Sequence, residues 1–286
     1  MKKNNEVGTL YIVGTPIGNM RDITIRALDT LKEVDLILAE DTRQTVKLLN
    51  HYEISKKMIS YHRHNEVDKI NQVVTILEEG KNIALVSDAG MPCVSDPGYA
   101  LVYKLVELGY DIEVIPGVTA CITAVVKSGM DTTRFSFEGF LSVNKKQRRE
   151  KLDAMKNETR TMIFYEAPHK IINTLEDMSL YFGLNRKIVV ARELTKRYEE
   201  HIRGSIEEVI KHFEEVQPKG EMVVIVSGQD ENVLKQKEKD DLNEISIEDL
   251  FNKYIKEGKT KKESVKLVAK MKNIDKNIVY KATLDL

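Results

Sequence analysis

The chain has 286 residues, of which 42% are hydrophobic and 31% are charged, and its formal net charge is −1. This size and composition fit a globular protein with more than one hydrophobic core, and no apolar run approaches the ~20 residues of a membrane-spanning helix. The chain has only two cysteines, and its first residues lack the apolar stretch of a secretion signal, so we expect a reduced, cytoplasmic protein.

The first part of the chain alternates short apolar strands with amphipathic helices. Strands are expected at residues 8–13, 34–39, 58–61, 82–87 and 112–115. The helices between them are expected at residues 22–33, 43–51, 67–80 and 98–109. Because short apolar strands that alternate with helices form parallel sheets covered on both faces, we predict an N-terminal α/β lobe over residues 1–118.

A second α/β lobe is expected over residues 119–228. A helix at residues 119–128 leads into it. Its strands are expected at residues 134–140, 160–166, 187–192, 202–205 and 221–227, and its helices at residues 145–156, 169–182 and 206–216. The lobe is followed by residues 229–245, which are polar and charged and are therefore predicted to form an exposed linker.

Residues 246–286 carry three apolar helical stripes. Ser246 stands three residues before Asp249, and Thr260 three residues before Glu263, which is the spacing of N-terminal capping boxes. Three short helices separated by tight turns resemble a helix-turn-helix. We therefore predict a small helical module at this end of the chain.

Glycine, proline and small polar residues follow three strands of the first lobe. The segments are GTPIGN at 14–19, SDAGMP at 87–92 with SDPG at 95–98, and PGVTA at 116–120. Because the carboxyl ends of parallel strands share one edge of the sheet, these segments predict a ligand site there. Neither the dinucleotide fingerprint nor the P-loop pattern is present, so a phosphate cradle is not expected.

Eight motifs in chain order carry a resemblance to a known family. They are GTPIGN, AEDTR, SDAGMP, SDPG, PGVTA, FEGFL, YEAPH and ARELTK. Together they resemble the tetrapyrrole-methylase superfamily, whose members are class III S-adenosylmethionine (SAM) methyltransferases. Within it they are similar to the branch that 2′-O-methylates a cytidine in the decoding region of 16S rRNA. The resemblance spans essentially the whole chain.

The resemblance implies a SAM site in the cleft between the two lobes, the small ribosomal subunit as the substrate, and a homodimer. The residues that match the SAM contacts of the family are Pro16, Asp88, Ala89, Gly90, Val94, Ser95, Thr119, Ala120, Tyr165, Glu166, Lys219, Gly220, Glu221 and Met222.

A general base would assist methyl transfer to a ribose hydroxyl, because a hydroxyl is a poor nucleophile at neutral pH. The candidates at motif ends are Asp41, His62, Glu166 and Glu193, and each of them could instead be structural. The histidines have no carboxylate or thiolate at metal-ligand spacing, so no metal is expected.

Basic side chains gather in two segments although the net charge is close to zero. The first contains Lys145, Lys146, Arg148, Arg149 and Lys151, against Glu150 alone. The second begins at residue 259 and has eight lysines, among them Lys261 and Lys262. Such runs can be solvated helix faces, but they also bind RNA phosphates, and we predict contacts with rRNA for both.

Two other functions are compatible with the same cofactor site. One is a C-methyltransferase that acts on a tetrapyrrole, which would need a broad pocket with arginines for acidic side chains. The other is an RNA-binding assembly factor that retains SAM without catalysing a reaction. SAM binding measured by calorimetry, together with a methyl-transfer assay on 30S subunits, would distinguish the three hypotheses.

Overall fold

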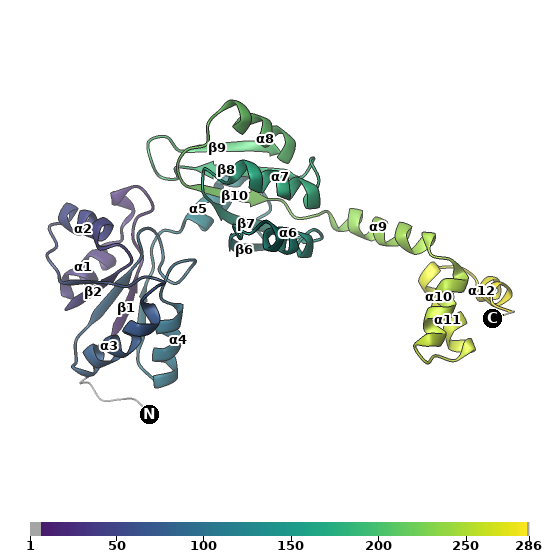
Figure 1. Ribbon diagram of the computed structural model, residues 1–286, viewed down its shortest axis with the longest axis horizontal. Helices are drawn as coiled ribbons and strands as arrows, with labels where there is room; N and C mark the ends of the chain where they lie inside the picture. Colours follow the sequence, from purple (N-terminus) through teal and green to yellow (C-terminus); the bar gives the residue numbers. More distant parts are fainter. Residues whose placement is uncertain (1–6, 285) are drawn as a thin grey trace. The chain divides into compact units, whose positions relative to one another are not determined.

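The apolar runs of the first part of the chain form a five-stranded parallel sheet in the computed structural model, which describes residues 7–284 and 286. The strand order is β3-β2-β4-β1-β5. Figure 1 labels β1 and β2 of this sheet and the helices α1 to α4. The strands are β1 (Leu10–Val13), β2 (Leu36–Ala39), β3 (Met58–Ser60), β4 (Ile83–Val86) and β5 (Ile112–Ile115). The predicted parallel α/β arrangement is confirmed.

Helices cover both faces of this sheet. They are η1 (Met20–Asp22, a 3-10 helix), α1 (Ile25–Glu33), α2 (Thr42–His51), α3 (Glu66–Glu78) and α4 (Tyr99–Leu108). Successive side chains of a strand point to opposite faces, so Leu36 and Leu38 of β2 pack in the core formed with α3 and α4. Ile37 and Ala39 pack in the core formed with α1 and α2. Burial on both faces explains why these strands are continuously apolar.

A second, mixed sheet follows, with the strand order β6-β7-β10-β8-β9. Strands β6 and β7 pair in parallel and the remaining pairs are antiparallel. The strands are β6 (Phe135–Phe140), β7 (Thr161–Glu166), β8 (Lys187–Arg192), β9 (Glu200–Ser205) and β10 (Met222–Val226). The helices are α5 (Ala120–Ser128), α6 (Lys145–Ala154), α7 (Ile171–Phe182) and α8 (Ile206–Glu215).

The central strand β10 is buried on both sides. Met222 and Val224 belong to a core that includes residues of α7 and α8. Val223 and Ile225 belong to a second core that includes Cys121 of α5. Helix α5 follows the last strand of the first sheet in the chain and packs against this face of the second sheet, so it joins the two sheets.

The two sheets belong to one unit, formed by Met1–Lys156 and Arg160–Ser227. Asn157–Thr159 and Gly228–Leu286 form the other unit. Of the helices described, none combines the length and the apolar character of a membrane-spanning segment.

The smaller unit contains four helices among its described residues: α9 (Glu231–Glu244), α10 (Ile247–Lys256), α11 (Lys261–Lys272) and α12 (Lys276–Ala282). The last three share a core of Leu250, Phe251, Val268, Ala269 and Val279. The predicted C-terminal helices are therefore present.

Two details of this unit differ from expectation. Residues 229–245, expected to be a linker, are largely helical, because Asp230 caps α9 by accepting a hydrogen bond from the Asn232 amide and lysine, glutamine and glutamate favour a helix. Thr260 and Glu263 form the complete capping box. The side chain of Ser246 accepts from the Asp249 amide, which is only half of such a box.

Candidate SAM site at the strand ends

The three loops predicted to converge are joined directly by backbone contacts. Thr15 donates its amide to the Gly90 carbonyl at 2.9 Å, and the Gly90 amide donates to the Thr15 carbonyl at 3.1 Å. A Cβ added to Gly14 would lie 2.8 Å from the backbone of Gly117, so the first and third loops are in contact as well. The contacts arise because β1 lies between β4 and β5 in the sheet.

A pocket of about 390 Å³ lies beside these loops and is lined from both sheets. Its lining includes most of the residues matched to the family's SAM contacts, namely Asp88, Ala89, Gly90, Val94, Thr119, Ala120, Tyr165, Glu166, Glu221 and Met222. The remaining lining residues were not predicted from the sequence; they are Ile17, Glu40, Met91, Asp96, Phe140, Ala167, Pro168, Leu194 and Val223. Several of these lie within or next to the quoted motifs, and that position was the available signal.

Five carboxylates line this pocket, and the pKa of three of them, Glu40, Asp88 and Asp96, is raised. Burial is the largest cause for Glu40, Asp88 and Asp96. The charge of Asp88 raises the pKa of Glu40 further, and the charge of Glu40 helps to raise the pKa of Asp96 to about 6. A ligand with positive charge would relieve this repulsion.

An aromatic group forms the wall contributed by the second sheet. The Tyr165 ring lies 4.9 Å from the Phe137 ring and 5.5 Å from the Phe140 ring, both measured between centroids. The Tyr165 hydroxyl accepts a hydrogen bond from the Cys121 amide at the start of α5. Burial raises the pKa of Tyr165, so its hydroxyl stays protonated.

Four residues matched to SAM contacts lie outside this lining. Pro16 lines an adjacent pocket of about 350 Å³, which shares Ile17, Asp88, Ala89 and Glu221 with the first. The Ser95 carbonyl accepts a hydrogen bond from Arg63. Lys219 and Gly220 line neither pocket, but a Cβ on Gly220 would lie 2.2 Å from Glu193 Oε1. Gly220 therefore permits close packing of two loops.

Asp41 and His62, two of the candidate bases, do not line the larger pocket, although the Asp41 amide donates to Asp88 Oδ1 of the lining at 3.0 Å. Hydrogen bonds from Arg43 lower the pKa of Asp41 to about 2. Asp41 also caps α2 by accepting from the Arg43 amide. His62 Nε2 lies 3.2 Å from Asn65 Nδ2.

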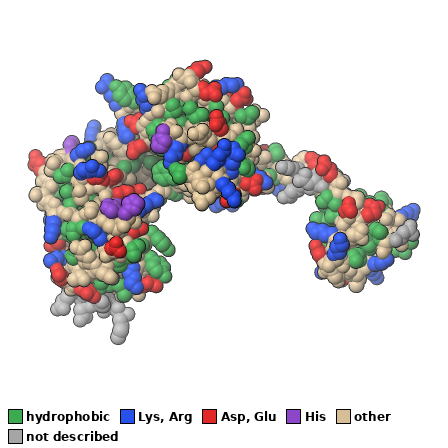
Figure 2. Space-filling view, in the orientation of Figure 1, with side chains coloured by type: hydrophobic (Ala, Val, Ile, Leu, Met, Phe, Trp, Pro, Cys, Tyr) green, Lys and Arg blue, Asp and Glu red, His purple; other side chains and the backbone are tan. Residues whose placement is uncertain are grey.

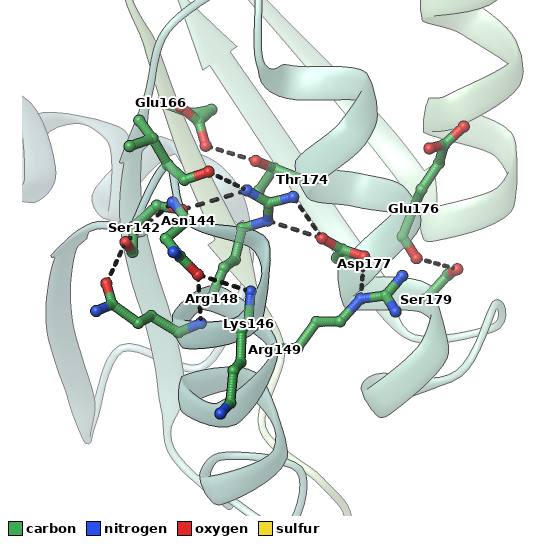
Figure 3. Close-up of polar contacts among 12 residues, drawn as sticks. Ser142, Asn144, Lys146, Arg148, Arg149, Glu166, Thr174, Glu176, Asp177 and Ser179 are labelled. Carbon is green, nitrogen blue, oxygen red and sulfur yellow. Dashed lines mark hydrogen bonds and ion pairs between the residues drawn. The ribbon is translucent and has the colours of Figure 1, made fainter.

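Glu166 and Glu193 are the other candidate bases, and their carboxylates are already engaged. Glu166 lines the pocket, but it accepts from the Ala167 amide at 2.8 Å. It also accepts from Thr174 Oγ1 at 2.6 Å (Figure 3). Glu193 accepts from Lys196 Nζ at 3.1 Å and from the Glu221 amide at 3.2 Å. Within the described residues, no group of three His, Cys, Asp or Glu side chains could hold a metal ion.

The structure divides the basic side chains of α6 into different environments. Figure 2 shows Lys and Arg side chains gathered over the part of the second lobe that contains α6. Lys145 and Lys146 are exposed. The side chain of Arg148 is only 12% exposed and is paired with a carboxylate, and Lys151 Nζ donates to the Glu138 carbonyl at 2.7 Å. Arg148 is therefore a structural anchor and not a surface group available to RNA.

The family model described as Tetrapyrrole (Corrin/Porphyrin) Methylases matches residues 9–210. The chain belongs to this family. The predicted fold class and the predicted membership of this methyltransferase family are thereby confirmed.

Two relatives in the tetrapyrrole methylase family carry the name ribosomal RNA small subunit methyltransferase I. The chain is 46% identical over 279 residues to the protein of Halalkalibacterium halodurans, covering 98% of this chain and 96% of that protein. It is 48% identical over 224 residues to the protein of Thermotoga maritima, covering 78% of this chain and 100% of the relative. A relative of this name therefore has no counterpart to about a fifth of the present chain.

The fold is also similar to solved structures of the family. A cobalamin biosynthetic enzyme, cobalt precorrin-4 methyltransferase, aligns with a TM-score of 0.60 at 16% identity, covering 79% of this chain and 98% of that one. At this identity the likeness shows the fold alone.

Proposed function

We propose that the chain is a SAM-dependent enzyme that 2′-O-methylates a cytidine in the decoding region of 16S rRNA within the small ribosomal subunit. The observation that carries the proposal is the carboxylate-lined pocket at the strand ends, in a chain that is 46% identical to a relative named for small-subunit rRNA methylation. An rRNA substrate implies a cytoplasmic location.

The residues of the pocket fit SAM, which carries a sulfonium, an ammonium group and an adenosine. Its volume of about 390 Å³ lies in the range of small-molecule sites. Glu40 and Asp88 would favour the positive groups, and Ile17, Leu194 and Val223 would cover apolar surface. SAM supplies the methyl group, bonded to a sulfonium that makes a good leaving group. Positioning of the acceptor hydroxyl would supply much of the remaining rate enhancement.

Asp96 is the base that we propose for the acceptor hydroxyl. It lines the pocket, and its pKa of about 6 leaves it ionised at neutral pH while keeping it more basic than an ordinary aspartate. Asp41, His62, Glu166 and Glu193, the candidates named by their motif positions, are less suited because they are engaged elsewhere or lie outside the pocket.

The RNA-binding surface that we propose consists of Lys145, Lys146 and Arg149 on α6. We propose Lys261 and Lys262, at the start of α11 in the smaller unit, as a separate contact. All four lysines are exposed. Arg149 is partly exposed, with 37% of its side chain accessible. The Lys151 amine donates a hydrogen bond to the Glu138 carbonyl of β6, so Lys151 would add positive charge to the surface but would not contact the RNA directly.

We also propose that the chain forms a homodimer through α4 and the edge strand β5. Tyr99, Tyr103 and Val106 lie on one face of α4, and all three are exposed, as is Val114 of β5. Apolar side chains grouped in this way are typical of a protein interface. A second copy of the chain is the occupant that the family resemblance implies.

A nucleotide-resolution map of 2′-O-methylation in rRNA tests the proposed activity. Cells without the gene should lose methylation at one cytidine of 16S rRNA, and purified enzyme with SAM should restore it on 30S subunits. The proposal would be contradicted if the rRNA map is unchanged without the gene and the purified enzyme with SAM methylates a tetrapyrrole. SAM binding without any transfer would favour an assembly factor.

A further inference from the structure

Asp177 of α7 is a buried carboxylate that has no part in the chemistry proposed above. The residue is 3% exposed and accepts hydrogen bonds from two consecutive arginines of α6 (Figure 3). Arg148 Nε donates to Oδ2 at 2.8 Å, and Arg149 Nε donates to Oδ1 at 2.8 Å. One side chain therefore fixes two positions of the basic helix.

The two arginines are held in different ways. Arg148 is inside: its Nη2 lies 2.6 Å from Asp177 Oδ2, and its Nη1 donates to the Ser142 carbonyl at 3.2 Å. It thus ties the segment before α6 to α7. Within the described contacts, Arg149 donates only from Nε. Its two terminal amino groups remain available at the surface.

This arrangement also determines the local charge. Burial raises the pKa of Asp177, but hydrogen bonds from Arg149 and Arg148 outweigh burial, and the pKa lies below its usual range. The ionised Asp177 carboxylate balances the charge of one guanidinium group, so the cluster of Asp177, Arg148 and Arg149 keeps a net positive charge. Lys145 stands four residues before Arg149 on α6, and residues at this spacing share one face of a helix.

We infer that Asp177 is a positioning residue that holds Arg149 so that its outer edge, together with Lys145, binds a backbone phosphate of the RNA substrate. A guanidinium fixed at Nε can present its remaining donors to a phosphate without losing further side-chain freedom. The inference rests on the proposed rRNA substrate. In this arrangement Arg148 supports the phosphate site and Arg149 contacts the RNA.

The decisive experiment replaces the buried pair by apolar residues in the full-length chain, as Arg148→Met with Asp177→Leu. This double variant leaves the net charge unchanged, and exchanging a buried ion pair for apolar side chains is often neutral for stability. We expect the SAM dissociation constant and kcat to stay within about twofold of wild type, while KM for 30S subunits rises about tenfold because Arg149 is no longer held. Arg149→Gln should raise KM to a similar extent.

Asp177→Asn provides a second test, with Glu176→Gln as its control. Glu176 is an exposed neighbour on α7, so both substitutions remove one negative charge at nearly the same place. Asp177→Asn should raise KM, and Glu176→Gln should leave KM at the wild-type value or lower it. Binding of a 16S rRNA fragment, measured without SAM, should follow the same order.

Two outcomes would overturn the inference. One is a double variant that methylates 30S subunits with the wild-type KM, because Asp177 would then serve packing alone. The other is a KM for Asp177→Asn equal to that of Glu176→Gln. A wild-type enzyme that neither binds nor methylates rRNA would instead contradict the proposed function.

Discussion

Thr15 and Gly90 exchange two backbone hydrogen bonds, of 2.9 and 3.1 Å, although they are 75 residues apart in the chain. The exchange joins the loop after β1 to the loop after β4 and places Gly90 at the pocket. Gly90 has φ of +81°, and a Cβ there would lie 3.4 Å from Ile17 Cγ2. A Cβ would therefore fit at van der Waals contact, and the cost of a larger side chain comes from the left-handed backbone and from the pocket that Gly90 lines.

Gly90→Val should raise the SAM dissociation constant by well over tenfold, because the side chain would enter the pocket and strain the loop. Calorimetry measures the affinity. Gly109→Val is the matched control, since Gly109 has φ of +75° and nothing within 4 Å of an added Cβ. Both variants should lose about 1–2 kcal/mol of stability from the left-handed backbone. Equal SAM affinity in the two variants would remove Gly90 from the site.

Asp96→Asn should lower kcat by about 10²- to 10⁴-fold, the usual contribution of a general base. A base acts in its ionised form, and the pKa of Asp96 is about 6, so wild-type kcat should fall as the pH drops through about 6 and level off above it. Burial raises this pKa most, the charges of Glu40 and Asp88 raise it further, and Ser87 and Arg63 lower it.

The pH profile of single-turnover methylation on 30S subunits measures this effect. Asp111→Asn, which removes an exposed carboxylate outside the pocket, should keep the wild-type profile. If Asp96→Asn retains both the rate and the acidic limb, another group accepts the proton.

Replacing Lys145 and Lys146 with Ala should weaken RNA binding and reduce its salt dependence. Each lost phosphate contact on single-stranded RNA lowers the log–log slope by about 0.7, so two contacts lower it by about 1.4. Filter binding between 50 and 200 mM salt measures the slope. Lys32 and Lys211, exposed on α1 and α8, are the control pair, and an equal slope for both pairs would contradict the proposed surface.

Truncation after Gln229 should preserve SAM binding while reducing methylation of 30S subunits. The larger unit ends at Ser227 and contains the whole pocket. The relative from Thermotoga maritima, which matches only 78% of this chain, indicates that a family member can be shorter. In the full chain, Lys261→Ala with Lys262→Ala should reproduce part of the loss. Full activity of the truncated enzyme would leave the helical module a role in stability alone.

Local sequence determined the secondary structure and the position of the candidate SAM site. Strand β10, at Met222–Val226, is apolar throughout because both of its faces are buried, and that pattern is visible without a structure. The motif around Gly90 was equally visible, because glycine and proline follow three strands whose carboxyl ends share one edge of a parallel sheet. Residues 229–245 are the exception, since a polar composition suits both a linker and an exposed helix.

Tertiary structure alone decided which side chains of a motif are free to act. Arg148 and Lys146 have the same charge in the same basic run, yet only 12% of the Arg148 side chain is exposed, because it pairs with Asp177, 29 residues away in the chain. Asp96 gains its raised pKa from burial and from Glu40, which a different strand brings to the pocket. Burial and charge–charge distance depend on the packing of segments far apart in sequence, and no local pattern encodes them.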